Sequence, residues 1–138
     1  MNEQKNVDTV RNAYAAFGRG DIEALLGMFT EDIDWQFFGP EELPMTGQRK
    51  GKPEVARFFK QVGEHWNFER FDPNHFVSQG DDVVALGAYA GTSKTTGRKF
   101  SSEWAHLFVV KNGKIAKFRE YADTANLLQA LAPATTRV

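Results

Sequence analysis

Residues 103–123 carry the strongest local signal in the chain, a pair of strands joined by a tight turn. Apolar and polar residues alternate on both sides of Asn112-Gly113, and this dipeptide between two alternating segments is typical of a β-hairpin. The segment contains His106 and Glu120, the best candidates in the sequence for acid–base chemistry. The register of the hairpin therefore decides whether these two side chains meet.

Two registers differ in the side chains that share a face. A two-residue turn at Asn112-Gly113 pairs Val110 with Ile115. The shared face then holds Trp104, His106, Phe108, Lys117, Arg119 and Tyr121. A three-residue loop over residues 111–113, with its glycine in the left-handed conformation, shifts the register by one. The shared face then holds Trp104, His106, Phe108, Ala116, Phe118, Glu120 and Ala122.

The three-residue loop is the favoured register. A shift of one residue moves a whole strand between core and solvent, so only one register makes a sensible core. The three-residue loop gathers the aromatic residues on one face and leaves Lys117 and Arg119 on the other. It also places His106 and Glu120 together among apolar neighbours.

The remainder of the chain contains helical patterns first and strand patterns later. Apolar spacing and caps predict helices over about residues 6–17, from Ile22 after an Asp21 cap, over 54–64 after Pro53, and after an Asp123 cap. Alternation predicts strands over 32–38, 67–78 with a break at Asp72-Pro73, 82–90, 98–110 and 114–122. Residues 39–51, with several prolines and glycines, are predicted to form a loop.

This order of elements is typical of an α+β fold, in which helices lie on one face of a largely antiparallel sheet. A curved sheet with helices across its open side encloses a cavity. The chain has 138 residues without an internal repeat or a linker, which predicts one domain over residues 1–138.

Composition excludes several classes of function. The net charge of −1 and the scattered basic residues do not favour binding to nucleic acid or to a membrane. The chain has no cysteine, so disulfides and thiolate chemistry are excluded. It contains no phosphate-binding loop or metal-ligand spacing, so neither a metal nor a cofactor is expected. Without an apolar run of membrane length or a signal-peptide pattern, a cytoplasmic protein is expected.

Two segments of the chain resemble a known family. The first is Tyr-Ala-Ala-Phe-Gly-Arg-Gly-Asp-Ile-Glu-Ala-Leu at 14–25, and the second is the hairpin, with Trp-Ala-His-Leu-Phe, Asn-Gly-Lys-Ile and Arg-Glu-Tyr-Ala-Asp. They resemble the SnoaL-like branch of the nuclear-transport-factor-2-like superfamily, which has a cystatin-like fold and also holds ketosteroid isomerases and limonene epoxide hydrolases. The resemblance implies a cone-shaped α+β barrel, a curved antiparallel or mixed sheet with about three to four helices over its concave face. It also implies a homodimer formed through the outer face of the sheet.

The resemblance extends to candidate catalytic residues. In SnoaL-like polyketide cyclases the hairpin holds a histidine and, fourteen positions later, an aspartate that acts as acid–base catalyst, and His106 and Glu120 match these positions. Glutamate keeps the carboxylate but moves its oxygens by about one methylene. Tyr14 resembles the tyrosine on the first helix of ketosteroid isomerases, whose two carboxylates fall near Phe37 and Ala105 here. Steroid isomerisation is therefore not expected.

Limonene epoxide hydrolases need an Asp-Arg-Asp set of residues. Glu120 could replace one aspartate, but the other two positions fall around Gly87 and Tyr89. Epoxide hydrolysis is therefore not expected either.

The predicted site combines three catalytic candidates with an apolar wall. Glu120 would move protons at a carbon next to a carbonyl, with His106 orienting it or stabilising an enolate oxygen, and Tyr14 donating a further hydrogen bond. The predicted cavity wall consists of Trp35, Phe58, Phe59, Trp104, Phe108 and Phe118. These residues indicate a cofactor-independent cyclase or isomerase that acts on a small apolar carbonyl compound.

Plainer interpretations of the same residues stay open. His106 could be a core histidine that only pairs with Glu120, Glu120 could be an exposed strand residue paired with a lysine or arginine, and Tyr14 could be an ordinary core residue. The whole chain could correspondingly be a small-molecule binding protein or a dimerisation module.

Overall fold

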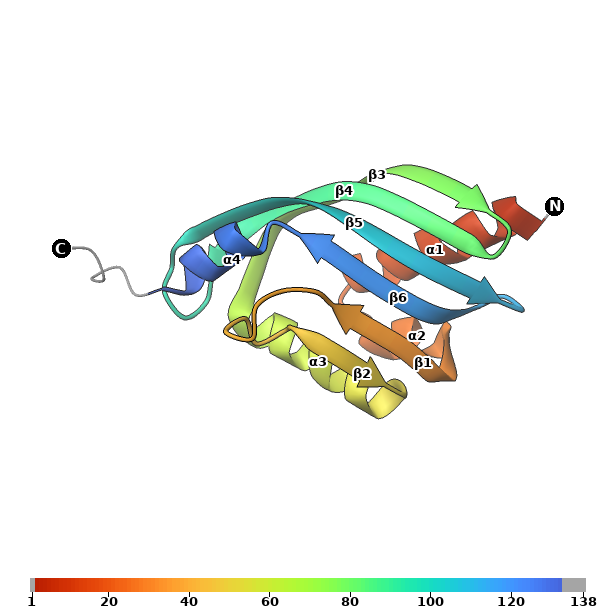
Figure 1. Cartoon of the computed structure of the whole chain (residues 1–138), viewed down its shortest axis with the longest axis horizontal. Coiled ribbons are helices and arrows are strands. Elements are labelled where there is room, and N and C mark those ends of the chain that lie inside the picture. Colours follow the sequence, from red (N-terminus) through yellow and green to blue (C-terminus); the bar gives the residue numbers. More distant parts are fainter. Residues whose placement is uncertain (1, 133–138) are drawn as a thin grey trace.

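The computed structural model describes residues 2–132 (Figure 1). The helices are α1 (Asn2–Gly18), α2 (Ile22–Gly27), α3 (Lys52–His65) and α4 (Thr124–Leu131). The strands are β1 (Phe29–Phe37), β2 (Gly47–Lys50), β3 (Trp66–Gln79), β4 (Asp82–Ser93), β5 (Lys99–Lys111) and β6 (Lys114–Ala122). No helix within residues 2–132 has the length and apolar character needed to cross a lipid bilayer.

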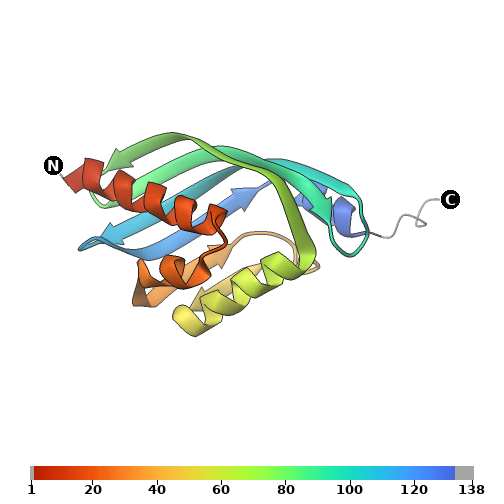
Figure 2. The same ribbon diagram turned by 180° about the vertical axis from the view of Figure 1, so that it is seen from behind.

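The six strands form one curved sheet in the order β2-β1-β6-β5-β4-β3. Strand β1 runs parallel to β6 and all other neighbours are antiparallel, so the predicted α+β fold with a mixed sheet is confirmed. Helices α1, α2 and α3 lie across one face of the sheet, as Figure 2 shows, and α4 lies at one end of it. Within the described residues the edge strands β2 and β3 do not pair, so the sheet is open rather than a closed barrel.

The predicted alternation and helix caps are observed. Ile33, Trp35 and Phe37 are all buried on the inner face of β1. The Asp21 side chain accepts a hydrogen bond from the amide of the third residue after it, and Asp123 does the same at the start of α4. Each cap satisfies an amide that has no partner within the helix.

The hairpin register combines features of both predicted alternatives. The turn has two residues, with Val110 opposite Ile115 and both Asn112 and Gly113 at positive φ, as a type I′ turn requires. The predicted three-residue loop is therefore wrong.

A β-bulge at Ala116 restores the face that the three-residue loop was expected to produce. Val110 pairs with Ile115 and Val109 with Lys117, so Ala116 has no residue opposite it. Ile115 and Phe118, three positions apart, are both buried, which a regular strand with its period of two does not allow. Beyond the bulge the strands resume their pairing.

The structure corrects three predictions about the strands. β1 begins at Phe29, ahead of the predicted start at residue 32, and β2 lies within the predicted loop 39–51. β2 is a polar edge strand and carries no apolar alternation. β3 continues through Asp72-Pro73, where the pairing with β4 shifts by one residue after Pro73. A proline is accommodated there because β3 is an edge strand and has a bulge at this point.

Candidate functional site

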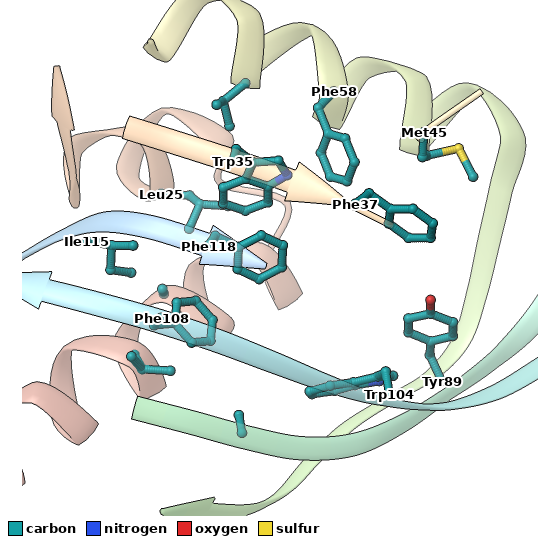
Figure 3. Close-up of a cluster of buried hydrophobic side chains, with 14 of the residues drawn as sticks. Leu25, Trp35, Phe37, Met45, Phe58, Tyr89, Trp104, Phe108, Ile115 and Phe118 are labelled. Atoms are coloured by element: carbon teal, nitrogen blue, oxygen red, sulfur yellow. The ribbon is translucent and has the colours of Figure 1, made fainter. Parts of the chain in front are cut away.

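A small cavity lies between the sheet and the helices. Its volume is about 80 Å³ and its walls are almost entirely apolar. Five of the six predicted wall residues line it, namely Trp35, Phe58, Phe59, Phe108 and Phe118. Figure 3 shows several of these aromatic rings gathered between α3 and the hairpin strands. Trp35 and Phe118 are stacked, with ring centroids 3.8 Å apart.

Trp104 is the sixth predicted wall residue, and it lies behind His106 instead of on the cavity wall. Its indole stacks on the imidazole at 3.9 Å with an interplanar angle of 16°. The indole also covers Gly87, where a side-chain carbon would collide with it. Trp104 therefore supports the ring of His106, and the glycine on β4 provides the space that this requires.

The hairpin brings His106 and Glu120 directly opposite each other. Both are buried, with exposed fractions of 4% and 7%, so the interpretation of Glu120 as an exposed residue paired with a lysine or arginine is wrong. The distance between His106 Nε2 and Glu120 Oε1 is 3.4 Å. Although this is short enough for an ion pair, Nε2 makes no hydrogen bond within the described part of the chain, because its N–H is not aimed at the carboxylate oxygen.

Two tyrosines extend this pair into a line of four polar side chains, which we term the polar chain: Tyr14, His106, Glu120 and Tyr89. The hydroxyl of Tyr14, from α1, lies 2.7 Å from His106 Nδ1. The hydroxyl of Tyr89, from β4, donates to Glu120 Oε2 at 2.8 Å. Four elements of the fold therefore meet at the polar chain, and all four of its members line the cavity.

Both tyrosines stay protonated at any ordinary pH. Burial and the negative charge of Glu120 raise the pKa of Tyr14. The same two causes, together with the hydrogen bond to Glu120, raise the pKa of Tyr89 well above 10.0. When Tyr14 donates to Nδ1, the ring proton of a neutral His106 is on Nε2, on the side of Glu120.

Tyr89 is the member of the polar chain that the sequence analysis did not select. It lies on the inner face of β4, in register with the buried Val83 and Ala85. The sequence did show a residue with a hydroxyl group at a position that alternation places on the inner face. Its partner Glu120 is on a strand that is not adjacent to β4, so alternation alone did not identify the contact.

Glu120 is the one carboxylate among the described residues that line the cavity, and no lysine or arginine lines it. Among the described residues there is also no group of three or more histidine, aspartate or glutamate side chains that could hold a metal ion. The chemistry available to the site is therefore that of a carboxylate, an imidazole and two hydroxyls. These groups can accept, donate and hold protons.

Comparison with known proteins gives the family. A family model described as a SnoaL-like domain matches residues 10–118, which is most of the chain. The protein belongs to the SnoaL-like family. The matched region includes Tyr14, Tyr89 and His106 and ends two residues before Glu120.

Solved structures agree with this SnoaL-like assignment. An NTF2-like protein from Burkholderia xenovorans LB400 superposes with a TM-score of 0.87 and 34% identity, over 96% of this chain and 99% of the other. TerC, co-crystallised with polyporic acid, has a TM-score of 0.81 and 25% identity, over 91% of this chain and 97% of the other. The Mycobacterium tuberculosis protein Rv0034, itself uncharacterised, is 25% identical over 126 residues, covering 91% of this chain and 95% of its own length.

Proposed function

We propose that this SnoaL-like protein is a cofactor-independent acid–base enzyme that acts on a small apolar carbonyl compound, as a cyclase or an isomerase. The observation that carries the proposal is the buried pair of Glu120 and His106 in an apolar cavity. No lysine or arginine among the described residues lines the cavity, so no permanent cation neutralises the carboxylate beside a bound ligand.

In the proposed reaction Glu120 is the catalytic base. The hydrogen bond from Tyr89 occupies Oε2 and leaves Oε1 free to take a proton from the carbon next to the carbonyl group. The C–H bond breaks, an O–H bond forms on Glu120, and the electron pair moves to the carbonyl oxygen to give an enolate. In an isomerase, Glu120 then returns the proton to a different carbon of a conjugated enolate, and the carbonyl group re-forms. In a cyclase, the enolate carbon forms a C–C bond to a second carbonyl carbon, and the alkoxide that results takes the proton from Glu120.

His106 is the proposed partner of the enolate oxygen. Its Nε2–H is buried and unpartnered within the described residues, so a ligand oxygen would supply the missing acceptor. Tyr14 is a positioning residue in this proposal, because its hydroxyl is already engaged by His106 Nδ1 at 2.7 Å. It keeps the ring proton on the nitrogen that faces the ligand.

Isotope exchange tests the proposal directly. Acetophenone carries C–H bonds next to a carbonyl group, and proton NMR in D₂O measures the rate at which they exchange. We expect the protein to accelerate this exchange and Glu120→Gln to lower the rate by about 100-fold or more. Glu103→Gln, an exposed glutamate on β5, is the matched control and should exchange at the wild-type rate. Equal rates for Glu120→Gln and the wild type would refute the proposed base.

A binding protein without catalysis is the second candidate. It is favoured by the glutamate at position 120, where the cyclases that the chain resembles have an aspartate, since the longer side chain displaces the carboxylate oxygens. TerC, a relative co-crystallised with polyporic acid, supports a small-molecule ligand under either candidate. Binding of acetophenone without any exchange above the buffer rate would favour this second function.

We also propose that two copies associate through the outer face of the sheet. Leu86, Ala105 and Tyr121 lie side by side on β4, β5 and β6, and Phe38 stacks on Tyr121 at 4.9 Å. Leu86, Tyr121 and Phe38 are exposed. A row of exposed apolar side chains is typical of an interface, and the homodimers of the superfamily that the chain resembles use this face.

A further inference from the structure

We infer that the cavity takes an uncharged molecule of one ring that carries a carbonyl or hydroxyl oxygen, and excludes the carboxylate anion of the same size. The inference rests on the proposed function, since it assigns a ligand class to the same cavity. Three properties of the described residues support it: the charge of the lining, the volume of the cavity and the unpartnered hydrogen-bond donors.

The charge of the lining disfavours anions. With Glu120 ionised and His106 neutral, the net charge of the lining is −1. With His106 protonated as well, the net charge is zero and still not positive. No lysine or arginine among the described residues lines the cavity to offset a further negative charge. A carboxylate ligand would lose its hydration, and it would lie in an apolar space beside Glu120. An uncharged ligand of the same shape has no charge to desolvate and is not repelled by Glu120.

The volume limits the ligand to a single ring. The cavity measures about 80 Å³, whereas an apolar cavity known to bind benzene measures about 150 Å³. One six-membered ring therefore already requires lining side chains to move. Phe59 and Phe71 line the cavity and are only partly buried, so their rings can turn with less disturbance than those of fully buried neighbours.

The unpartnered donors favour a ligand oxygen. His106 Nε2 and Trp35 Nε1 are both buried without a hydrogen-bond acceptor within the described residues. Both side chains pack on the ring of Phe118, at centroid distances of 4.8 Å and 3.8 Å. A carbonyl or hydroxyl oxygen at this point would satisfy a donor that otherwise costs free energy.

Two fluorinated ligands of similar shape test the inference. 4-Fluoroacetophenone is uncharged and 4-fluorobenzoate is an anion at pH 7.5, and ¹⁹F NMR titration gives the dissociation constant of each. We expect the ketone to bind the wild-type protein at least about tenfold more tightly, because a like charge in a desolvated site costs this much or more. Equal or tighter binding of the benzoate, or no binding of either ligand, would overturn the inference.

Variants of the lining identify the source of the discrimination. Glu120→Gln removes the negative charge at nearly constant shape, so the preference for the ketone should shrink by about tenfold. Glu103→Gln should leave the preference unchanged. Should Glu120→Gln not fold, His106→Asn provides the second test. It keeps Glu120, so the preference for the ketone should persist, and its loss would contradict the role of the glutamate.

This inference and the proposed function can fail separately. If the ketone binds in preference to the benzoate but its C–H bonds do not exchange with D₂O, the ligand class stands and the catalytic proposal fails. If exchange is accelerated but the benzoate binds equally well, the catalytic proposal stands and the ligand class is wrong.

Discussion

Two carboxylates on neighbouring strands have opposite surroundings. Asp34, on the outer face between β1 and β6, receives hydrogen bonds from Arg119 at 3.0 Å and from Gln48 at 2.9 Å. Glu120, the residue that follows Arg119, points to the inner face and has no lysine or arginine beside it in the described cavity lining. Arg119 and Glu120, adjacent on β6, thus point to opposite faces of the sheet: Arg119 binds the carboxylate of Asp34, and the carboxylate of Glu120 is left available for chemistry.

These surroundings explain why Glu120, and not Asp34, is the candidate base. Burial tends to raise the pKa of Asp34, but the hydrogen bonds from Arg119 and Gln48, together with nearby positive charge, lower it overall. A carboxylate held in this way is a poor proton acceptor at neutral pH. Glu120 is held by the neutral hydroxyl of Tyr89 and faces an imidazole, so its free oxygen can still accept a proton.

The largest expected effect is on turnover. Glu120→Gln should lower the exchange rate of acetophenone by about 100-fold or more, whereas Asp34→Asn should leave it within about twofold, because the outer face does not reach the cavity. Proton NMR in D₂O measures both variants under the same conditions. Comparable losses in the two variants would remove the functional distinction between the faces.

The next effect is the stability contributed by the Tyr89 hydroxyl. Tyr89→Phe leaves the buried Oε2 of Glu120 without its donor, which should lower the free energy of unfolding by about 1–3 kcal/mol. Tyr121→Phe, on the exposed outer face, removes a hydroxyl that makes no hydrogen bond within residues 2–132, and it should change the free energy of unfolding by less than about 0.5 kcal/mol. Urea unfolding measures both, and equal losses would show that the buried hydrogen bond adds nothing.

A smaller effect is expected on the pH dependence of stability, through the carboxylate of Asp34 on the outer face. The pKa of Asp34 in the folded protein is lower than its ordinary 3.8, so its stabilising contribution is complete above that value and is lost as the pH falls through the folded pKa. Below about pH 4, Asp34→Asn should therefore lose less stability on acidification than the wild type does. The exposed Asp32→Asn is the control in urea unfolding from pH 7 to pH 3. An identical pH dependence for Asp34→Asn and the wild type would contradict the prediction.

The smallest expected effect on the stability of the fold comes from the exposed apolar residues on the outer face of the sheet, Phe38, Leu86 and Tyr121. Leu86→Lys places a charge on an exposed position of β4, so the free energy of unfolding of one chain should change by less than about 0.5 kcal/mol. Sedimentation velocity should nevertheless show fewer dimers than for the wild type, because a buried unpaired charge disfavours association. Asn12→Lys, at an exposed position of α1 on the other side of the sheet, controls for added charge. Unchanged dimers in Leu86→Lys would place the interface elsewhere.

The local signals in the sequence determined the fold class and most of the elements. Alternating residues, helix spacing and the Asp21 and Asp123 caps act over a few residues, so they could be read without knowledge of the rest of the chain. The predicted three-residue loop also brought His106 and Glu120 together, but the structure makes this contact through a two-residue turn and a bulge. The polar edge strand β2 was missed, because it pairs along one side only and carries no apolar pattern.

Only the tertiary structure decided how the site is assembled. The bulge at Ala116 arises because Ile115 and Phe118 must both enter the core, and it is this bulge that places Glu120 opposite His106. The contact from Tyr89 and the support of His106 by Trp104 depend on the curvature of the sheet and on the space above Gly87. These contacts join residues that are distant in sequence, so no local pattern specifies them, and the small volume of the cavity follows from the way they pack together.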